Sequence, residues 1–157
     1  MRHVGAVLAV VCVSACTAAR PEARIVGTWR VVAIETRDSA AAPWRRPFGD
    51  APSGYAVYAA DGTHLLQFGR TPAVPFAAAS DRAGTDAEVR AAFFDHFAWQ
   101  GRWRLDHARA TIIHDIEGSP WPSWRATMQE RPYRLAGDTL VLGDTARTRR
   151  VFVRVRR

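Results

Sequence analysis

AWQGRWRL, residues 98–105, is the stretch that decides the fold. From Trp99 on, apolar and polar residues alternate along it. The apolar series is Trp99, Gly101, Trp103 and Leu105, and the polar series is Gln100, Arg102 and Arg104. Successive side chains of a strand point to opposite faces of a sheet, so this period of two predicts a strand with one apolar face and one solvated face.

Seven other segments have the composition and turn punctuation of short strands. They are residues 25–36, 54–59, 63–69, 110–116, 124–135, 139–142 and 149–156. Asp61-Gly62 separates two of them and is a strong hairpin signal. Pro132 predicts a bulge or an edge position within its segment, because proline has no N–H to donate to a neighbouring strand.

One segment has a helical period instead. Thr85-Asp86-Ala87-Glu88 is a capping box, and the apolar residues after it are spaced as on one face of a helix. This predicts a short amphipathic helix over about residues 86–96. Eight sequential antiparallel strands leave two open edges unless the sheet closes. We therefore expect an all-β, eight-stranded antiparallel up-and-down barrel, ahead of an open sandwich, with this helix between the third and fourth strands.

The N-terminal residues have a different character. Residues 1–15 combine a basic start with an apolar run, which predicts a secretion signal. Val-Ser-Ala-Cys at 13–16 resembles the bacterial lipobox, in which Cys16 is lipidated and becomes the first residue. We expect a signal peptide over 1–15, a lipidated tether over 16–24 and the barrel domain over 25–157. The alternative is ordinary secretion with cleavage near Ala18 or Ala19.

The residues around this motif also predict a location. The only cysteines are Cys12 and Cys16, so the barrel domain contains neither a thiol nor a disulfide. Thr17 follows the lipobox, and the lack of Asp there resembles lipoproteins sorted to the outer membrane. We expect an exported envelope lipoprotein, held on the periplasmic face of the outer membrane by its N-terminal lipid.

Two groups of residues resemble a known family. Gly27-Thr28-Trp29 in the first strand and Arg154 in the last resemble the lipocalin signature, in which an arginine covers a tryptophan at the barrel base. A longer ordered series resembles the bacterial and fungal lipocalin-like domain family over about residues 25–157. It consists of Gly54-Tyr55, Tyr58, Asp61-Gly62, His114, Ser119, Pro122, Trp124, Arg131, Tyr133, Leu135, Gly137-Asp138 and Leu140 to Leu142.

The resemblance implies a calycin-type barrel but supplies no catalytic residues. Ala126 departs from the family pattern, which has a glycine there, and we expect the barrel to be narrower at that strand.

Alternation places polar side chains on otherwise apolar faces. His114 shares a face with Ile112 and Ile116, and His64 shares one with Leu66 and Phe68. Each histidine either lines a pocket or is a core residue with a backbone or hydroxyl partner. The candidate ligand-binding residues are Tyr55, Tyr58, His64, Gln67, His114, Trp124 and Arg131. We interpret Arg131 as a clamp for an anion, with pairing to Glu130 or Glu117 at the rim as the alternative.

Composition limits the function classes. The net charge is +7, and all 22 basic residues are arginine, which favours a solvated arginine-rich surface over a nucleic-acid partner. We expect no metal or cofactor, because His114 and Glu117 fall on opposite faces and no phosphate loop or serine elbow is present.

The expected function is binding of a small, mainly apolar or amphipathic molecule inside a lipid-anchored barrel. One alternative is a barrel enzyme that carries out proton transfer on a small molecule. The other is a packed structural or interaction lipoprotein whose arginine-rich exterior binds acidic surfaces.

Overall fold

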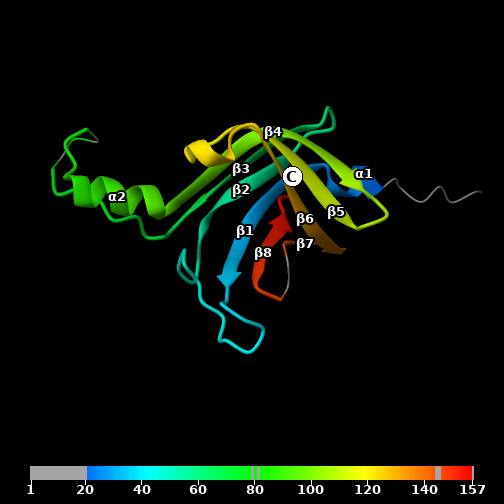
Figure 1. Cartoon of the computed structure of the whole chain (residues 1–157), viewed down its shortest axis with the longest axis horizontal. Helices are drawn as coiled ribbons and strands as arrows, with labels where there is room; N and C mark the ends of the chain where they lie inside the picture. Colours follow the sequence, from blue (N-terminus) through cyan, green and yellow to red (C-terminus); the bar gives the residue numbers. More distant parts are fainter. Residues whose placement is uncertain (1–20, 79, 81, 144–145, 157) are drawn as a thin grey trace, which may run out of the picture.

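The computed structural model describes residues 21–156 except 79, 81, 144 and 145. The expected signal peptide and Cys16 lie outside the described residues. Eight strands form one closed antiparallel barrel in which each strand pairs with the next and the last returns to the first (Figure 1). The strands are β1 Gly27–Thr36, β2 Ser53–Tyr58, β3 Thr63–Gly69, β4 His96–Asp106, β5 Thr111–Gly118, β6 Thr127–Ala136, β7 Thr139–Leu142 and β8 Thr148–Arg154. This confirms the predicted fold class.

The first helix was not expected. α1 (Pro21–Ile25) overlaps the end of the segment 16–24 assigned to a tether, and its last residue, the fully buried Ile25, belongs to the barrel core. Its last residue is therefore part of the folded domain, and the barrel domain begins before Gly27.

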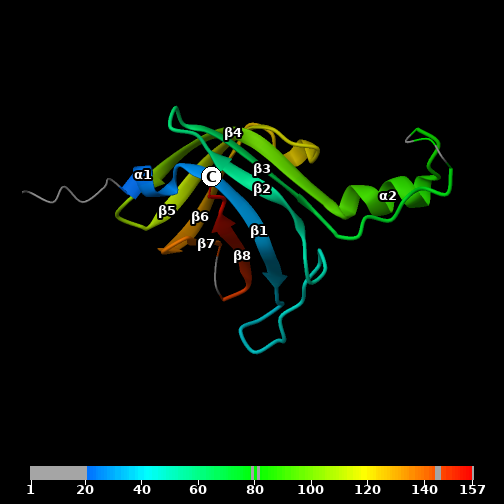
Figure 2. The ribbon, with the colours of Figure 1, turned by 180° about the vertical axis from the view of Figure 1, so that it is seen from behind.

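The second helix lies where the capping box predicts it. In α2 (Asp86–Phe94), Thr85 accepts a hydrogen bond from the backbone N–H of Glu88, and the Glu88 carboxylate accepts one from the backbone of Thr85. α2 ends two residues earlier than predicted, and none of its residues is buried. It extends away from the barrel (Figures 1 and 2), and its Phe93 packs on Trp121 instead of on the core. The predicted amphipathic face thus does not pack on the barrel.

Two predictions for the 124–135 segment are wrong. Trp124 ends a short 3₁₀ helix, η1 (Pro122–Trp124), and the strand begins only at Thr127. Pro122 at the first helical position favours that turn. Pro132 causes no register shift, since it lies exposed at the end of the β5–β6 pairing, opposite Thr111. The bulges lie instead in β1, between Val31 and Ala33, and in β4, between Gln100 and Gly101.

The backbone conformation of Ala126 explains why the family pattern has a glycine at this position. Ala126 has φ +57°, a left-handed conformation that favours glycine, and it leads into β6. Its side chain is exposed, so it does not narrow the barrel as expected. The departure from the family pattern therefore bears on backbone strain at this turn.

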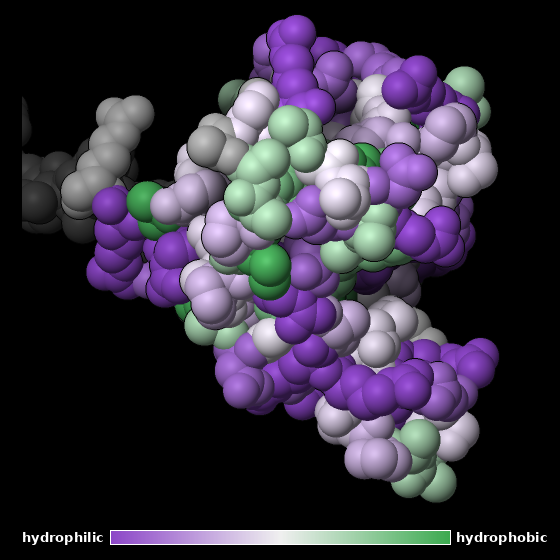
Figure 3. Space-filling model, turned by 90° about the vertical axis from the view of Figure 1, so that its left-hand side faces the viewer, coloured by the Kyte–Doolittle hydropathy of each residue, from purple (hydrophilic) through white to green (hydrophobic). Residues whose placement is uncertain are grey.

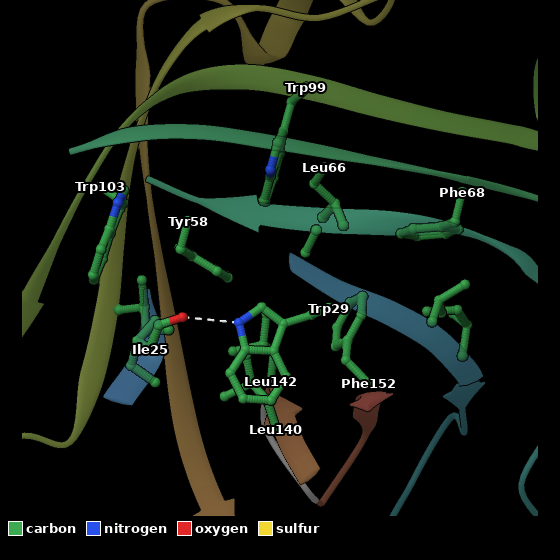
Figure 4. Packing of buried hydrophobic residues seen from close by; sticks show 14 of the residues in the cluster. Ile25, Trp29, Tyr58, Leu66, Phe68, Trp99, Trp103, Leu140, Leu142 and Phe152 are labelled. Carbon is green, nitrogen blue, oxygen red and sulfur yellow. Dashed lines mark hydrogen bonds between the residues drawn. The ribbon is translucent and has the colours of Figure 1, made fainter. Parts of the chain in front are cut away.

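The two ends of the barrel differ. α1 and the short connections after β2, β4 and β6 lie at one end, and the segments 37–52, 70–95, 119–126 and 143–147 connect strands at the other. Buried apolar residues fill the first end around Trp29, with Leu140, Leu142 and Phe152 beside it (Figure 4). We call the first end of the barrel the base and the other end the mouth. An occupant of the barrel therefore has access only from the mouth or through the wall.

The exterior is mixed in character. Seen from the side on which α2 lies, apolar areas are broken up by hydrophilic ones (Figure 3). Within the described part of the chain, no helix is long and apolar enough to cross a membrane.

Candidate functional site

The residues of the expected signature close the base. The Trp29 ring is fully buried, and its indole N–H donates to the Ile25 carbonyl over 2.8 Å. The Arg154 guanidinium lies 4.1 Å from the ring centre and donates to the Val26 carbonyl. A side-chain carbon at Gly27, where φ is +141°, would lie 2.6 Å from Nη1 of Arg154. The positive φ favours glycine here, and its missing side chain leaves room for the arginine that covers the tryptophan.

A buried polar cluster lies above this base. The Tyr58 hydroxyl contacts Nε2 of His114 over 3.1 Å, and the Trp99 indole N–H donates to Nε2 of His64 over 2.9 Å. The two imidazole rings lie 4.5 Å apart between their centroids, and both histidines are fully buried. We call Tyr58, His64, Trp99 and His114 the polar cluster. Three of its members were expected at a site, and Trp99 was not among the candidate residues.

The second ring nitrogen of each histidine fixes its tautomer. Nδ1 of His64 lies 3.1 Å from the Val57 carbonyl, and Nδ1 of His114 lies 3.3 Å from the Gln129 carbonyl. Because a carbonyl only accepts, both Nδ1 atoms carry the proton and both Nε2 atoms accept. Each histidine is thus a neutral core residue whose two ring nitrogens both have hydrogen-bond partners. Of the two possibilities that the sequence left open, this is the core residue and not the free pocket-lining group.

Burial shifts the titration of the cluster away from neutral pH. It lowers the pKa of His64 to about 4. It also lowers the pKa of His114, with further contributions from His64, Arg131 and Arg150. Burial raises the pKa of Tyr58. General acid–base catalysis works best with groups whose pKa lies near the operating pH. Burial moves the pKa of all three groups away from neutral pH.

Two candidate residues lie outside the barrel. Tyr55 is 50% exposed, and its cross-strand partner Gln67 is exposed as well. Tyr58 and His64, which also form a cross-strand pair, point inward. Each outer residue is three positions from its inner counterpart, and an odd separation along a strand reverses the face. The assignment of Tyr55 and Gln67 to an interior site is therefore wrong.

The other two candidates lie toward the mouth. Trp124 packs at the edge of the interior, with its ring 5.4 Å from Phe97 and 5.2 Å from Trp99 between centroids. The Arg131 guanidinium lies 5.6 Å from the Trp99 ring centre and donates to Oε1 of Gln129. It also donates to the backbone carbonyl of Glu130. Among the described side chains, Arg131 has no carboxylate partner, so the expected alternative of a rim ion pair is wrong.

Arg150 is an interior residue that the sequence reasoning missed. It lies between Ile34 and Leu142, both of which are buried. Burial, together with the charge of Arg131, lowers the pKa of Arg150 to about 10. Alternation gives a signal for this placement, because Arg150, Phe152 and Arg154 share one face of β8, and Arg154 was already expected inside.

The inner face of β6 is reached by solvent. Its inward residues Thr127, Gln129, Arg131, Tyr133 and Leu135 are all partly exposed, and they alternate with fully exposed outward residues. The core residues at the base are almost fully buried. An inward side chain of a closed barrel is exposed only where solvent enters the barrel or passes a gap in its wall. The interior is therefore packed at the base, and solvent reaches part of each inward side chain of β6.

Hollows also occur away from the interior. One of about 310 Å³ lies between α2 and the segment before it, with Arg70, Phe76, Ala92 and His96 among its lining. No candidate residue from the sequence lines it. Within the described ranges, no group of three His, Cys, Asp or Glu residues is placed to hold a metal ion.

Comparison with known proteins connects this barrel to one group. A family model described as a lipocalin-like domain matches residues 26–151. A 4'-hydroxy-3'-methoxypropiophenone carrier protein of Aspergillus oryzae is 35% identical over 66 residues, which are 38% of this chain and 60% of the relative. The match thus spans less than two thirds of that relative.

Proposed function

The chain belongs to the lipocalin-like domain family, and from that premise we propose that it binds a small, mainly apolar molecule inside the barrel, against the inner face of β6. The family and the carrier relative both suggest small-molecule binding. Ligands of small barrels enter at the mouth, where one end is left unfilled.

The partial exposure of the inward β6 residues carries this proposal. A barrel packed throughout would bury them as completely as it buries Trp29 and Phe152. Near the inner face of β6, the rings of Phe97, Trp99 and Trp124 contact one another edge-on or at a tilt, and they offer apolar aromatic surface. This favours a binding protein over the packed structural protein, and it favours a flat ligand.

The relative's name indicates one ligand of suitable shape. 4'-Hydroxy-3'-methoxypropiophenone is an aromatic ketone with a phenol, so it has a flat apolar body and polar ends. We propose that this chain takes a molecule of that general kind.

An enzyme is the weaker candidate. Tyr58 and His114 are in contact, as a proton-transfer pair requires. However, burial lowers the pKa of His114 and raises that of Tyr58, so neither group exchanges protons readily near neutral pH. Both are better suited to form a fixed polar wall.

The proposed location rests on the N-terminal motif alone. We propose that residues 1–15 direct export and that a lipid on Cys16 anchors the barrel to the outer membrane, where it would meet apolar molecules.

A fluorescence titration tests the binding proposal. N-phenyl-1-naphthylamine, a neutral apolar probe, should bind saturably, and 4'-hydroxy-3'-methoxypropiophenone should displace it. Gln129→Phe fills space on the inner face of β6 and should weaken probe binding at least tenfold. Met128→Phe, on the exposed outer face of the same strand, is the matched control and should bind like the wild type. Absence of saturable binding, or equal affinity in both variants, contradicts the proposal.

A further inference from the structure

We propose that Arg131 and Arg150 together form an anion site inside the barrel, which holds a carboxylate or phenolate group at one end of the ligand. This inference rests on the proposed function and assigns the chemistry of the ligand's polar end. The shared chemistry is a singly charged oxygen anion on a flat apolar body.

Strand register brings the two guanidinium groups to the same region. Arg150 on β8 pairs with Leu142 on β7, and Leu142 pairs with Tyr133 on β6. Arg131 lies two residues before Tyr133 and shares its inward face. A side-chain carbon at Gly143 would lie 3.4 Å from Nη1 of Arg150, so that guanidinium lies near the end of β7 that faces the mouth. Two cations from β6 and β8 therefore flank the short strand β7.

Neither cation pairs with a carboxylate among the residues that the structure describes. None of the ion pairs between described residues includes Arg131 or Arg150. Arg131 donates only to uncharged groups, and Arg150 forms no hydrogen bond through its side chain with the described residues. By contrast, Arg149 next to it pairs with the buried Glu35. A partly buried guanidinium without a counter-ion is unfavourable, because it loses hydration that nothing replaces.

An anion would relieve this cost at both residues. Guanidinium groups bind carboxylates through parallel, charge-assisted hydrogen bonds, which are stronger than neutral ones. The ring of Trp99 lies beside Arg131 and offers a surface for a flat body attached to the anion. The neighbouring polar cluster is already satisfied internally, whereas the two arginines are cationic donors without a described counter-ion.

A matched pair of competitors isolates the charge. Cinnamate and cinnamamide have the same flat body and differ by one charge, and each is measured by displacement of N-phenyl-1-naphthylamine. Cinnamate should bind about tenfold to a hundredfold more tightly than cinnamamide, as expected for charge-assisted hydrogen bonds. Arg131→Met and Arg150→Met should each remove most of this preference, measured within each variant as the ratio of the affinities for cinnamate and cinnamamide.

A second pair distinguishes the two sources of the anion. 4'-Hydroxy-3'-methoxypropiophenone ionises at its phenol, whereas 3',4'-dimethoxypropiophenone does not. Weaker binding of the first compound in Arg150→Met, with the second unchanged, supports a phenolate ligand. If only the cinnamate pair responds, the site takes a carboxylate.

Control variants and stability separate the possible outcomes. Arg134→Met, on the exposed face of β6, should keep the full preference for cinnamate. Without ligand, Arg150→Met should unfold at the same temperature as the wild type or higher, because no partner loses a contact. Probe binding without any preference for cinnamate overturns the anion site and leaves the proposed function standing. A marked loss of stability in Arg150→Met overturns the anion site alone. Absence of probe binding overturns both the anion site and the proposed function.

Discussion

The indole N–H of Trp99 donates to Nε2 of His64 over 2.9 Å, inside a barrel where both side chains are buried. This bond keeps the proton of His64 on Nδ1, which donates to the Val57 carbonyl. A protonated His64 has no acceptor left for its Nε2 proton, since Trp99 only donates. The contact therefore holds His64 neutral.

The first prediction is a loss of stability in mild acid. The pKa of His64 is about 4 in the folded protein against an ordinary 6.5, so only the unfolded chain binds the proton between these values. The contribution of His64 to the free energy of unfolding should be fully present above pH 6.5. As the pH falls to 4, the loss of this contribution alone should lower the free energy of unfolding by about 3 kcal/mol. Urea unfolding at pH 7, 5.5 and 4.5 measures it.

His64→Gln provides the control, because its amide oxygen still accepts from Trp99 but does not titrate. The fall between pH 6.5 and 4.5 should be clearly smaller in this variant. Glu35, whose pKa Arg149 lowers below the usual 4.5, also loses its contribution as the pH falls through about 4.5, but it does so equally in the wild type and in His64→Gln. A pH dependence identical to that of the wild type would show that His64 is not the group responsible.

A second prediction concerns the base of the barrel. Trp29→Ala removes a fully buried ring and should lower the free energy of unfolding by about 3–5 kcal/mol. Arg154→Met should also destabilise, since it removes the guanidinium above the ring. Arg156→Met is the control, because its side chain is 78% exposed, and it should change stability by less than about 0.5 kcal/mol. Equal effects of the two arginine variants in denaturant unfolding would contradict the role of Arg154.

A third prediction uses the strained turn before β6. Ala126→Gly should stabilise the protein by about 0.5–1 kcal/mol, because the left-handed conformation costs alanine about 1–2 kcal/mol and glycine loses part of this gain through its greater freedom when unfolded. Ala136→Gly, at the other end of the strand, should destabilise instead. Thermal unfolding compares them, and stabilisation by both variants or by neither would refute the strain argument.

A fourth prediction tests the coupling of Tyr58 and His114. His114→Phe leaves the buried Tyr58 hydroxyl without its acceptor and should cost about 1–3 kcal/mol. Tyr58→Phe should cost a similar amount. The double variant should cost less than the sum, because it removes both polar partners together. Strict additivity would show that the 3.1 Å contact contributes nothing to stability.

These variants also separate the candidate functions. In a binding protein, His114→Phe should change the affinity for N-phenyl-1-naphthylamine. In an enzyme, it should abolish turnover of an added substrate while binding largely persists. In a packed barrel, it should change stability alone.

The fifth prediction concerns the N-terminus. Cys16→Ser should release the protein from membranes, because the lipid attaches to that thiol. Membrane and soluble fractions of cells that express each form measure this, with Cys12→Ser as the control that stays membrane-bound. A Cys16→Ser protein that is processed and fractionates like the wild type would refute the anchor.

Local chemistry in the sequence determined most of the fold. Alternation around Trp103 predicted the strands, Asp61-Gly62 predicted a hairpin, and the capping box at Thr85 predicted α2, because each signal depends on residues a few positions apart. Alternation also placed His64 and His114 inside correctly. The same rule excludes Tyr55 and Gln67 from an interior shared with Tyr58 and His64, since their separation is odd.

Only the tertiary structure decided what the interior residues do. Closure of the barrel brings Trp99 to His64, 35 positions away, and Tyr58 to His114, 56 positions away, and no local pattern encodes such partners. It also brings Arg150 near Arg131, although hydrophobic patterning assigns arginines to the surface. Whether a buried polar group is satisfied depends on the strands opposite it, and strand register is fixed only when the whole sheet closes.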